Sequence, residues 1–403
     1  MPSRKGKGRY MVQDIAVAGA GIGGLAFATL AAREGRRVTV FDQFDAPRPI
    51  GSGLVIQPVG QMVLDVAGAG DSARALGQKI HSMLGHEATT GRRVLDVTYD
   101  RKGGPHYGLG IHRAALFDCL LTAARDTGAE IRPDHRVSAR DGQRLIFANG
   151  TSDGPFELIV DAAGAASPLS PLQSRPLGYG AVWGTVPWPD TRLPTDRLSQ
   201  RYRAADRMIG ALPIGRLPDD QQPLAAIFWS LPADGHDAWR AAPLDHWKAE
   251  ATALWPDFAP FLETVTEHDV MTMARYTHGT LRTPVSEGLA HIGDAAHRAS
   301  PQLGQGANMA LLDAYALWSA LDRHPLDEAL RAYVLARRWH VWTYQVFSAV
   351  FTPQYQSDSR FLPKLRDHIL FPVSRIPPVP GILSRLVRGT LLPPLGSLHP
   401  RQP

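Results

Sequence analysis

The stretch DIAVAGAGIGGLAFATLAAREGRRVTVFD, Asp14 to Asp42, decides the fold. It contains an apolar strand, a glycine turn, a helix of small residues and a second strand, which is the βαβ opening of a doubly wound domain. Gly19, Gly21 and Gly24 fill the pattern G-x-G-x-x-G. The first permits the tight turn, the second lets the backbone approach a pyrophosphate, and the third lets helix and strand pack closely. Phosphates bound there would lie at the helix N-terminus, whose free N–H groups favour negative charge.

Asp42 ends the second predicted strand, 18 residues after Gly24. A carboxylate at this position accepts hydrogen bonds from the hydroxyls of an adenosine ribose. The strand, the helix, Gly35 after the helix and this acid agree with one another. The segment therefore predicts binding of a dinucleotide whose ribose is unphosphorylated.

A second motif lies in LAHIGDAAHRASPQLGQGANMALLDAYALWSAL, Leu289 to Leu321. A predicted strand leads to Asp294, an extended segment follows with Pro301, and GQGAN then opens a helix of Met, Ala and Leu. The N-terminus of that helix can stabilise an anion.

This second motif resembles that of the single-component FAD-dependent monooxygenases, the p-hydroxybenzoate hydroxylase-like family. GDAAH, Pro301 and GQGAN, followed by Asp313, match the family's motif almost residue for residue. The resemblance covers roughly residues 12 to 345. PIGSGLVIQPVG, residues 49–60, is similar to the family's loop after the second strand, and IHRAALFDCLLTAA, residues 111–124, to its R-x-x-L helix.

The resemblance implies FAD as the cofactor and NAD(P)H as the reducing co-substrate. Arg113 would contact the FAD, Asp294 would bond a ribityl hydroxyl or the pyrophosphate region, and the helix start would face the N1/O2 locus of the flavin. The expected cofactor-binding residues are Gly19, Gly21, Gly24, Asp42, Arg113, Asp294, Pro301, Gly304, Gln305, Gly306, Ala307 and Asn308.

The implied fold class is α/β. A Rossmann-like FAD-binding domain with a βαβ unit and a mixed sheet would be interrupted by an antiparallel β-sheet substrate domain with helices, and followed by a C-terminal helical strap. Aromatic and β-branched runs between Gly178 and Pro232, separated by Pro, Asp and Gly clusters, favour such strands. The expected boundaries are residues 10–80, 105–172 and 280–345 for the FAD-binding domain, 81–104 and 173–279 for the substrate domain, and 346–403 for the tail.

The activity that the resemblance implies is hydroxylation of an aromatic, heteroaromatic or quinonoid small molecule with O2, through a flavin C4a-hydroperoxide. Two alternatives stay open. The chain could be an FAD oxidoreductase of the same fold that does not insert oxygen, such as a reductase or dehydrogenase. It could also be a flavin-binding protein with weak activity. The metal-hydrolase and P-loop motifs H-E-x-x-H, C-x-x-C and G-x-x-x-x-G-K-[ST] do not occur in the sequence, so no metal site is expected.

No motif singles out a catalytic base. A phenolic substrate invites one, and the candidates are Tyr179, Tyr202, Tyr276, His81 and His86, each of which is also suited to a structural role. The catalytic residues therefore remain unassigned. Four aromatic side chains suit either a water-free substrate cavity or a plain core: Trp183, Trp188, Phe228 and Trp229.

The stretch LIVDAAGAASPLS, residues 158–170, departs from the family pattern G-A-D-G-x-x-S. Ala163 stands where the family has an aspartate that is associated with FAD and NAD(P)H binding. Asp161 lies two residues away, and side chains at i and i+2 share a face of a strand. We therefore consider that Asp161 partly replaces the missing carboxylate. The small residues around Gly164 indicate that the backbone passes close to the cofactor.

Charge and cysteine content limit the possible partners and location of the protein. The net charge of +5 is concentrated at the ends, with four basic residues in 1–10 and six basic residues against Asp367 in 361–403, so no nucleic-acid groove is expected. The single cysteine, Cys119, favours a cytoplasmic protein. We expect a monomer or a homodimer. The tail, which includes GILSRLVRGTLL, has two interpretations: a strap packed on the protein, which we favour because prolines interrupt it, or a peripheral membrane contact that admits a lipophilic substrate.

Overall fold

The computed structural model describes residues 12–45, 52–100 and 104–398. Its first layer is a six-stranded sheet in the order β18-β19-β12-β1-β2-β8. All neighbouring strands in it are parallel except β18, which is antiparallel to β19. The strands are β1 Asp14–Ala18, β2 Arg37–Phe41, β8 Glu130–Arg132, β12 Leu158–Asp161, β18 Val285–Ser286 and β19 Leu289–His291. A mixed sheet of this kind is the one that the βαβ opening predicts.

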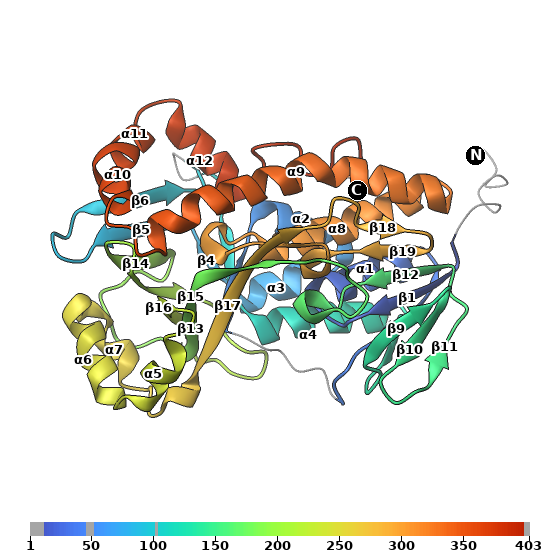
Figure 1. Ribbon diagram of the computed structural model, residues 1–403, viewed down its shortest axis with the longest axis horizontal. Helices are drawn as coiled ribbons and strands as arrows, with labels where there is room; N and C mark the ends of the chain where they lie inside the picture. Colours follow the sequence, from blue (N-terminus) through green and yellow to red (C-terminus); the bar gives the residue numbers. More distant parts are fainter. Residues whose placement is uncertain (1–11, 46–51, 101–103, 399–403) are drawn as a thin grey trace.

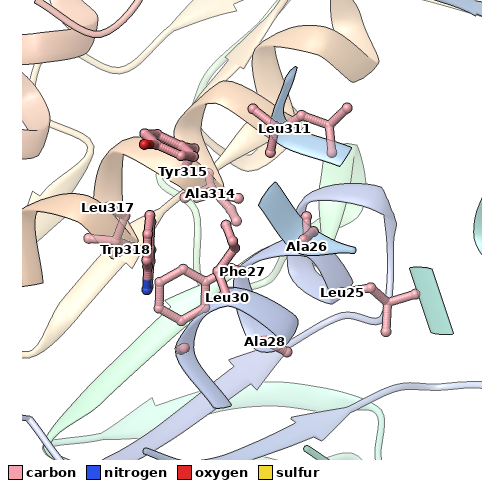
Figure 2. Packing of buried hydrophobic residues seen from close by; sticks show 14 of the residues in the cluster. Leu25, Ala26, Phe27, Ala28, Leu30, Leu311, Ala314, Tyr315, Leu317 and Trp318 are labelled. Atoms are coloured by element: carbon pink, nitrogen blue, oxygen red, sulfur yellow. The ribbon is translucent and has the colours of Figure 1, made fainter. Parts of the chain in front are cut away.

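Helices α1 and α8 form the centre of the core that covers one face of this sheet. The helix α1 spans Ile22–Arg33 and α8 spans Gly306–Leu321, and both are buried along almost their whole length. A Cβ atom added at Gly23 would lie 3.2 Å from the Cβ of Ala310, so the glycine lets the two helices approach closely. Figure 2 shows the side chains of α1 and α8 packed together, with Phe27 next to Trp318.

Further helices and two small sheets complete this half of the molecule. Helix α4 carries Cys119, the free and buried cysteine. The sheet β11-β10-β9 packs on the face of the main sheet opposite α1, and the sheet β3-β7-β4 leads into the second domain. The elements are α2 Pro58–Ala67, α3 Gly70–Leu76, α4 Arg113–Asp126, β3 Gly53–Ile56, β4 Gln78–Ile80, β7 Gly108–His112, β9 Val137–Asp141, β10 Arg144–Phe147 and β11 Ser152–Asp153.

The second large sheet has eight strands in the order β20-β17-β13-β16-β15-β14-β5-β6. Its pairs are antiparallel except β14 and β5, which run parallel. The strands are β5 Ser82–Glu87, β6 Arg93–Thr98, β13 Arg175–Pro187, β14 Arg197–Arg203, β15 Arg207–Pro213, β16 Leu224–Pro232, β17 Met271–Thr280 and β20 His297–Arg298.

Three short helices cover the outer face of the eight-stranded sheet: α5 His236–Ala241, α6 Leu244–Leu254 and α7 Ala259–Leu262. They form a separate aromatic core in which Trp229 of the sheet lies edge-on to Trp247 of α6. Figure 1 shows these helices at the lower left, on the side of the sheet that faces away from α1 and α8. The inner face of the sheet is thereby turned toward the glycine-rich motifs.

The chain ends in one long helix and a strap. Helix α9 spans Leu326–Tyr355, so the expected tail boundary at residue 346 falls inside it. Three short helices follow, α10 Leu362–Leu365, α11 Phe371–Ser374 and α12 Val379–Arg388. Figure 1 shows α9 to α12 along the upper edge of the molecule. Within the described part of the chain, no helix is long and apolar enough to cross a membrane.

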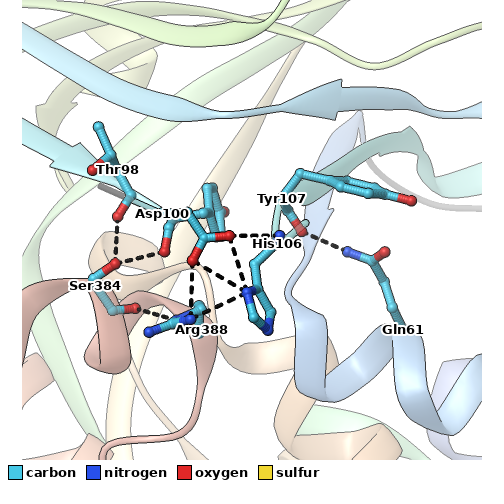
Figure 3. Close-up of polar contacts among 8 residues, drawn as sticks. Gln61, Thr98, Asp100, His106, Tyr107, Ser384 and Arg388 are labelled. Atoms are coloured by element: carbon cyan, nitrogen blue, oxygen red, sulfur yellow. Dashed lines mark hydrogen bonds and ion pairs between the residues drawn. The ribbon is translucent and has the colours of Figure 1, made fainter. Parts of the chain in front are cut away.

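The last segment is held against the FAD-side core, as the strap interpretation predicts. Leu395 and Leu398 belong to the main core, and Leu386 packs beside Met309. Figure 3 shows how α12 is fixed to the end of β6: the Ser384 hydroxyl donates to the Thr98 carbonyl (2.8 Å) and Arg388 pairs with Asp100 (3.2 Å). Residues 1–10, whose four basic residues contribute to the net charge, lie outside the described residues.

Candidate functional site

In the glycine turn between β1 and α1, two glycines pack against backbone atoms and one faces open space. Gly19 has a φ of +104°, and a Cβ there would lie 2.6 Å from the Ala162 carbonyl oxygen. A Cβ at Gly24 would lie 2.1 Å from the Gly19 carbonyl oxygen. At Gly21, in contrast, the nearest atom would be the Ala162 oxygen at 3.9 Å. Gly19 and Gly24 therefore close the turn, while Gly21 leaves room for a ligand.

Asp42 lies directly beyond β2, at the same edge of the sheet as the glycine turn. Its Oδ2 accepts a hydrogen bond from the Ala20 amide (2.7 Å) and its Oδ1 one from the Phe44 amide (3.1 Å). The carboxylate is thus fixed next to the turn in the position expected of a ribose acceptor.

The second motif lies beside the first because α8 packs on α1 (Figure 2). Asp294 sits in a short 3-10 turn with its side chain exposed. Pro301 begins another short turn that ends at Gly304, whose φ of +60° is left-handed. Gly306 then starts α8, where the amides of the first turn have no partner within the helix. These free amides lie at the sheet edge that the glycine turn occupies.

Two motif side chains point away from this space. The Asn308 carboxamide is fully buried and ties α8 to the strand β3, since its Oδ1 accepts from the Gln57 amide (2.7 Å) and its Nδ2 donates to the Val55 carbonyl (3.1 Å). Gln305 donates from Nε2 to the Val387 carbonyl of α12 (2.9 Å). Both residues can therefore serve a cofactor through their backbone, and their side chains brace the loop.

Arg113 begins α4, and its backbone amide donates to the Ser52 carbonyl (3.0 Å). Its guanidinium is exposed and makes no hydrogen bond with any described residue. The structure thus leaves this side chain available. The loop to which it is attached, PIGSG, is described only from Ser52 onward.

Several features of the fold itself fit FAD. Gly21, Gly164 and Gly306 line the sheet edge, and a Cβ at Gly164 or Gly306 would meet nothing within 4 Å. Beside Gly304, the buried Gln57 side chain accepts from the Tyr99 hydroxyl (2.6 Å), while its Nε2 has no partner among the described residues. Open glycines and an unpaired buried donor fit a large polar ligand that follows the backbone closely.

The FAD binding domain family matches residues 12–148 and 215–345, more than half of the chain. The chain belongs to this family.

Two relatives are similar along most of their length. The 6-methylpretetramide 4-monooxygenase of Streptomyces rimosus is 28% identical over 342 residues, which cover 81% of this chain and 80% of that protein. The 3-amino-4-hydroxybenzoate 2-monooxygenase of Streptomyces cremeus is 30% identical over 349 residues, which cover 79% of this chain and 82% of that protein. The expected family and FAD cofactor are confirmed, and the chain is an FAD-dependent monooxygenase.

A solved structure confirms the fold class. The tetrameric form of 2-methyl-3-hydroxypyridine-5-carboxylic acid oxygenase superimposes with a TM-score of 0.76, at 20% identity, and covers 93% of this chain and 96% of that one. The antiparallel sheet inserted into an α/β domain is therefore shared with a known oxygenase fold.

A buried ionic network supports the second motif of this flavoprotein. Asp313 on α8 is fully buried; its Oδ2 lies 2.6 Å from His297 Nε2 and accepts from the Gly293 amide (3.0 Å), while Arg337 donates from Nε to Oδ1 (2.7 Å). Burial alone raises the pKa of Asp313, but the charges of His297 and Arg337 outweigh it and lower the pKa to about 2. His297 therefore serves the architecture of this loop.

The small-residue stretch after β12 packs on the glycine turn, since the Ala162 carbonyl is the atom that a Cβ at Gly19 would strike. Asp161 does not face the cofactor space. Its carboxylate is fully buried, 2.7 Å from His291 Nδ1, and accepts from the Ser167 hydroxyl (2.7 Å) and the Ala163 amide (3.2 Å). The hypothesis that Asp161 replaces the missing family carboxylate is therefore wrong, because the side chain is turned inward and already bonded.

The loop before GQGAN is held by residues that the sequence reasoning missed. His278 on β17 accepts from the Ser300 amide at Nε2 (2.9 Å), and its pKa is lowered by burial and by the nearby charge of Arg175. The Ser300 hydroxyl bonds Ser348 (3.1 Å) and Thr352 of α9. No motif marks His278 because its role depends on the register between β17 and the loop.

The inner face of the eight-stranded sheet carries an aromatic set turned toward the flavin side. Trp183 and Phe228 are cross-strand neighbours with ring centroids 4.5 Å apart, and Trp183 Nε1 donates to the Tyr276 hydroxyl (2.8 Å). Trp188 and Trp229, which the sequence left open, belong instead to the outer core beneath α6 and α7. The alternation of side chains along a strand separates the two sets.

The candidate bases are mostly committed elsewhere. The Tyr179 hydroxyl donates to Asp358 (2.6 Å), and Tyr202 is buried with Arg366 over its ring (5.1 Å). His81 is exposed, and burial lowers the pKa of the half-buried His86. Of the five, Tyr276 alone is bonded on the inner aromatic face.

Two cavities accompany the site. A hollow of about 330 Å³ opens beside α2 and is lined by Gln61, His106 and Tyr107, next to the α12 contacts of Figure 3. No residue of the two glycine-rich motifs lines it. A smaller cavity of about 40 Å³ lies at the start of α8, between Gln305 and Gln345 of α9. The smaller cavity is the one that adjoins the second motif.

Proposed function

We propose that this flavoprotein inserts one oxygen atom of O2 into an aromatic, heteroaromatic or quinonoid small molecule, with NAD(P)H as the reductant of its FAD. The observation that carries the proposal is the convergence of two glycine-rich motifs at one sheet edge, opposite an inner sheet face lined by Trp183, Phe228 and Tyr276. When bound, the flavin supplies the redox and oxygen chemistry.

The chain would hold FAD with residues from both motifs. Gly19, Gly21 and Gly24 would present the start of α1 to the pyrophosphate, and Asp42 would accept from the adenosine ribose. Arg113 and Asp294, both exposed and free of side-chain partners among the described residues, would contact the remaining polar groups. The Pro301 to Asn308 segment would help to hold the flavin, and the amides of Ala307 and Asn308 at the start of α8 would stabilise negative charge on it.

The inner aromatic face would bind the substrate and exclude water. Trp183 and Phe228 present apolar rings, which suit a flat aromatic ligand. Burial raises the pKa of Tyr276 to about 12, so its hydroxyl stays protonated at neutral pH. The hydroxyl already accepts from Trp183 and can donate its own proton to an oxygen substituent of the substrate. Tyr276 is therefore the group we assign to orienting the substrate.

The arrangement of the two large sheets supports a division into two domains, although β20 joins the eight-stranded sheet from within the segment that we assign to FAD binding. We assign residues 10–80, 105–172 and 280–345 to FAD binding and residues 81–104 and 173–279 to the substrate. The single cysteine, buried and free, supports a cytoplasmic location. The partners we propose are the substrate and O2, with no nucleic acid, and the assembly state is a monomer or a homodimer.

The test measures whether labelled oxygen from 18O2 enters the product. The purified protein with FAD is supplied with NADH or NADPH, 18O2 and a panel of phenols, hydroxypyridines, quinolones and quinols. We expect at least one compound to accelerate flavin reduction and to acquire a single 18O atom. A compound that drives NAD(P)H oxidation but never acquires label would contradict the proposal and favour the non-oxygenating oxidoreductase. Tyr276→Phe should raise KM for a hydroxylated substrate about tenfold, the loss of one buried hydrogen bond.

A further inference from the structure

Helix α9 carries an apolar stripe that no described residue covers. Within residues 12–45, 52–100 and 104–398, every large exposed apolar side chain lies between residues 335 and 382. On α9 these side chains follow one another at intervals of four, three, four and four residues, so they share one helical face. The stripe consists of Leu335, Trp339, Trp342, Val346 and Val350.

The helices after α9, which Figure 1 shows along the same upper edge of the molecule, carry further exposed apolar side chains. Their exposed apolar side chains include Ile376, at 59% exposure, which adjoins two exposed prolines. This second set consists of Phe361, Ile369, Leu370, Val373, Ile376 and Ile382. A monomeric protein rarely exposes so many apolar side chains together unless they bind something. We call the two sets together the apolar face.

Exposed cations occur in the same segment of the chain as the apolar face. Between residues 331 and 398 six basic side chains are exposed and form no ion pair with any described residue: Arg331, Arg338, Arg360, Lys364, Arg375 and Arg385. The only exposed carboxylate of that segment is Asp358, which accepts from the Tyr179 hydroxyl. The surface is therefore apolar and cationic at once.

The stripe also contains aromatic side chains in an arrangement suited to an interface between water and lipid. Trp339 and Trp342 are more than half exposed, at 58% and 57%, with ring centroids 5.9 Å apart. The Arg338 guanidinium lies over the Trp339 ring at 5.2 Å. Tryptophan prefers the headgroup level of a bilayer, and arginine can extend from an apolar surface to phosphate.

We propose that the apolar face docks on the surface of a bilayer that contains anionic phospholipid. Six unpaired cations complement anionic headgroups, while the apolar side chains enter the headgroup region. The same charges oppose a second copy of the chain, because two such faces would bring together cations with no carboxylates to pair them. The protein would lie on the membrane, since no described helix can span it.

The experiment measures sedimentation of the full-length holoprotein with vesicles. Phosphatidylcholine vesicles are compared with vesicles that also contain phosphatidylglycerol, at low and high salt. We expect binding to the anionic vesicles only, reduced by salt. Trp339→Ser/Trp342→Ser should lower the partition coefficient about tenfold or more. Arg338→Gln/Arg375→Gln/Arg385→Gln should lower it roughly a hundredfold, at about fivefold per cation.

A matched control removes three charges elsewhere. Arg125→Gln/Arg192→Gln/Arg282→Gln changes the net charge equally, at exposed positions outside the apolar face, and should keep binding within twofold to threefold. Absence of wild-type binding overturns the proposal, as does equal loss in the control. A dimer that the two tryptophan substitutions convert to a monomer, without vesicle binding, would make this face a contact between copies. Flavin absorbance and melting temperature verify that each variant is folded, and none of these results depends on the substrate.

Discussion

At the scale of single residues, the site depends on glycines, which lack a Cβ atom. Gly19, Gly21 and Gly24 belong to one motif, but they have two different roles, packing and ligand access. The first and third leave no room for a Cβ because backbone atoms of the protein occupy the space, whereas the second faces open space. Substitutions at these positions should therefore separate folding from binding.

Gly21→Ala should weaken FAD binding and leave the fold intact. The added methyl group meets only the Ala162 oxygen at 3.9 Å, so the melting temperature of the apoprotein should stay unchanged. A methyl in the cofactor path should raise the Kd for FAD at least about tenfold, or 1.4 kcal/mol. Quenching of flavin fluorescence measures the Kd.

Gly24→Ala is the matched variant in the same helix. Alanine favours a helix by about 1 kcal/mol over glycine, but a Cβ 2.1 Å from the Gly19 oxygen forces the turn apart. Overpacking of this kind costs about 1–3 kcal/mol, so a net loss of apoprotein stability is expected. Unchanged stability of Gly24→Ala, or a destabilised Gly21→Ala, would contradict the division of roles.

Asp161 and Ala163 provide a second contrast between neighbouring residues. Asp161→Asn should destabilise the fold by about 3–5 kcal/mol, because it removes one partner of a buried pair with His291. The rate of flavin reduction per folded molecule should not change. Ala163→Asp restores the family's carboxylate at a half-buried position and should increase that rate severalfold with little effect on stability.

Stopped-flow reduction by NADPH and by NADH, together with urea unfolding, distinguishes these outcomes. If Asp161→Asn slows reduction without loss of stability, Asp161 does act on the cofactor, contrary to its inward position. If Ala163→Asp leaves reduction unchanged, the family aspartate has no separate role in this chain.

Residue identity was predictable where backbone geometry sets it. The glycines and Asp42 follow from strand, turn and helix periodicity alone. The directions of the Asn308 and Gln305 side chains were not predictable, because their partners at Val55 and Val387 are more than 80 residues distant. The inward turn of Asp161 was missed for the same reason: its partner His291 is 130 residues away.

At the scale of elements, the long helix α9 joins the strap to the cofactor loop. Its inner side holds Ser300 through Ser348 and Thr352, while His340 and Tyr344 bond the carbonyls of Gly389 and Leu386. The expected boundary at residue 346 follows the extent of the family resemblance, which ends near residue 345. The helix continues because its inner residues are buried by both the loop and the strap.

His340 makes the attachment of the strap sensitive to pH. Its Nε2 donates to the Gly389 carbonyl (2.9 Å) and its Nδ1 faces the Arg337 guanidinium (3.2 Å), so the ring is neutral. Burial and the charge of Arg337 lower the pKa of His340 to about 3. The unfolded chain binds the proton near pH 6.5, whereas the folded chain does not, so the stability that is fully present above pH 6.5 falls as pH decreases toward 3.

Urea unfolding between pH 7.5 and pH 5 should therefore show a loss to which His340 contributes about 2 kcal/mol. His340→Gln keeps a donor for Gly389 and should flatten that part of the slope. His246→Asn, at an exposed position on α6, is the control and should retain the full slope. Identical slopes for wild type and His340→Gln would show that another group dominates.

At the scale of the whole molecule, two sheets meet with the cofactor edge of one against the inner face of the other. The alternation of strands and turns predicted the second sheet, and the βαβ unit predicted the first. The parallel pairing of β5 with β14 was not predictable, since it depends on how a distant segment enters the sheet. Which tryptophans face inward was not predictable either, because a shift of one residue in register exchanges the two faces of a strand.

Cys119 has a practical consequence for testing this arrangement. It is the only thiol of the chain, it is buried in α4, and burial raises its pKa above the usual range. A maleimide dye should therefore not react with Cys119 in the native protein. A cysteine introduced at Val346 or Ile376 would be the sole reactive site on an otherwise unaltered background. The emission colour of an attached polarity-sensitive fluorophore would then report directly how far each position sinks into lipid.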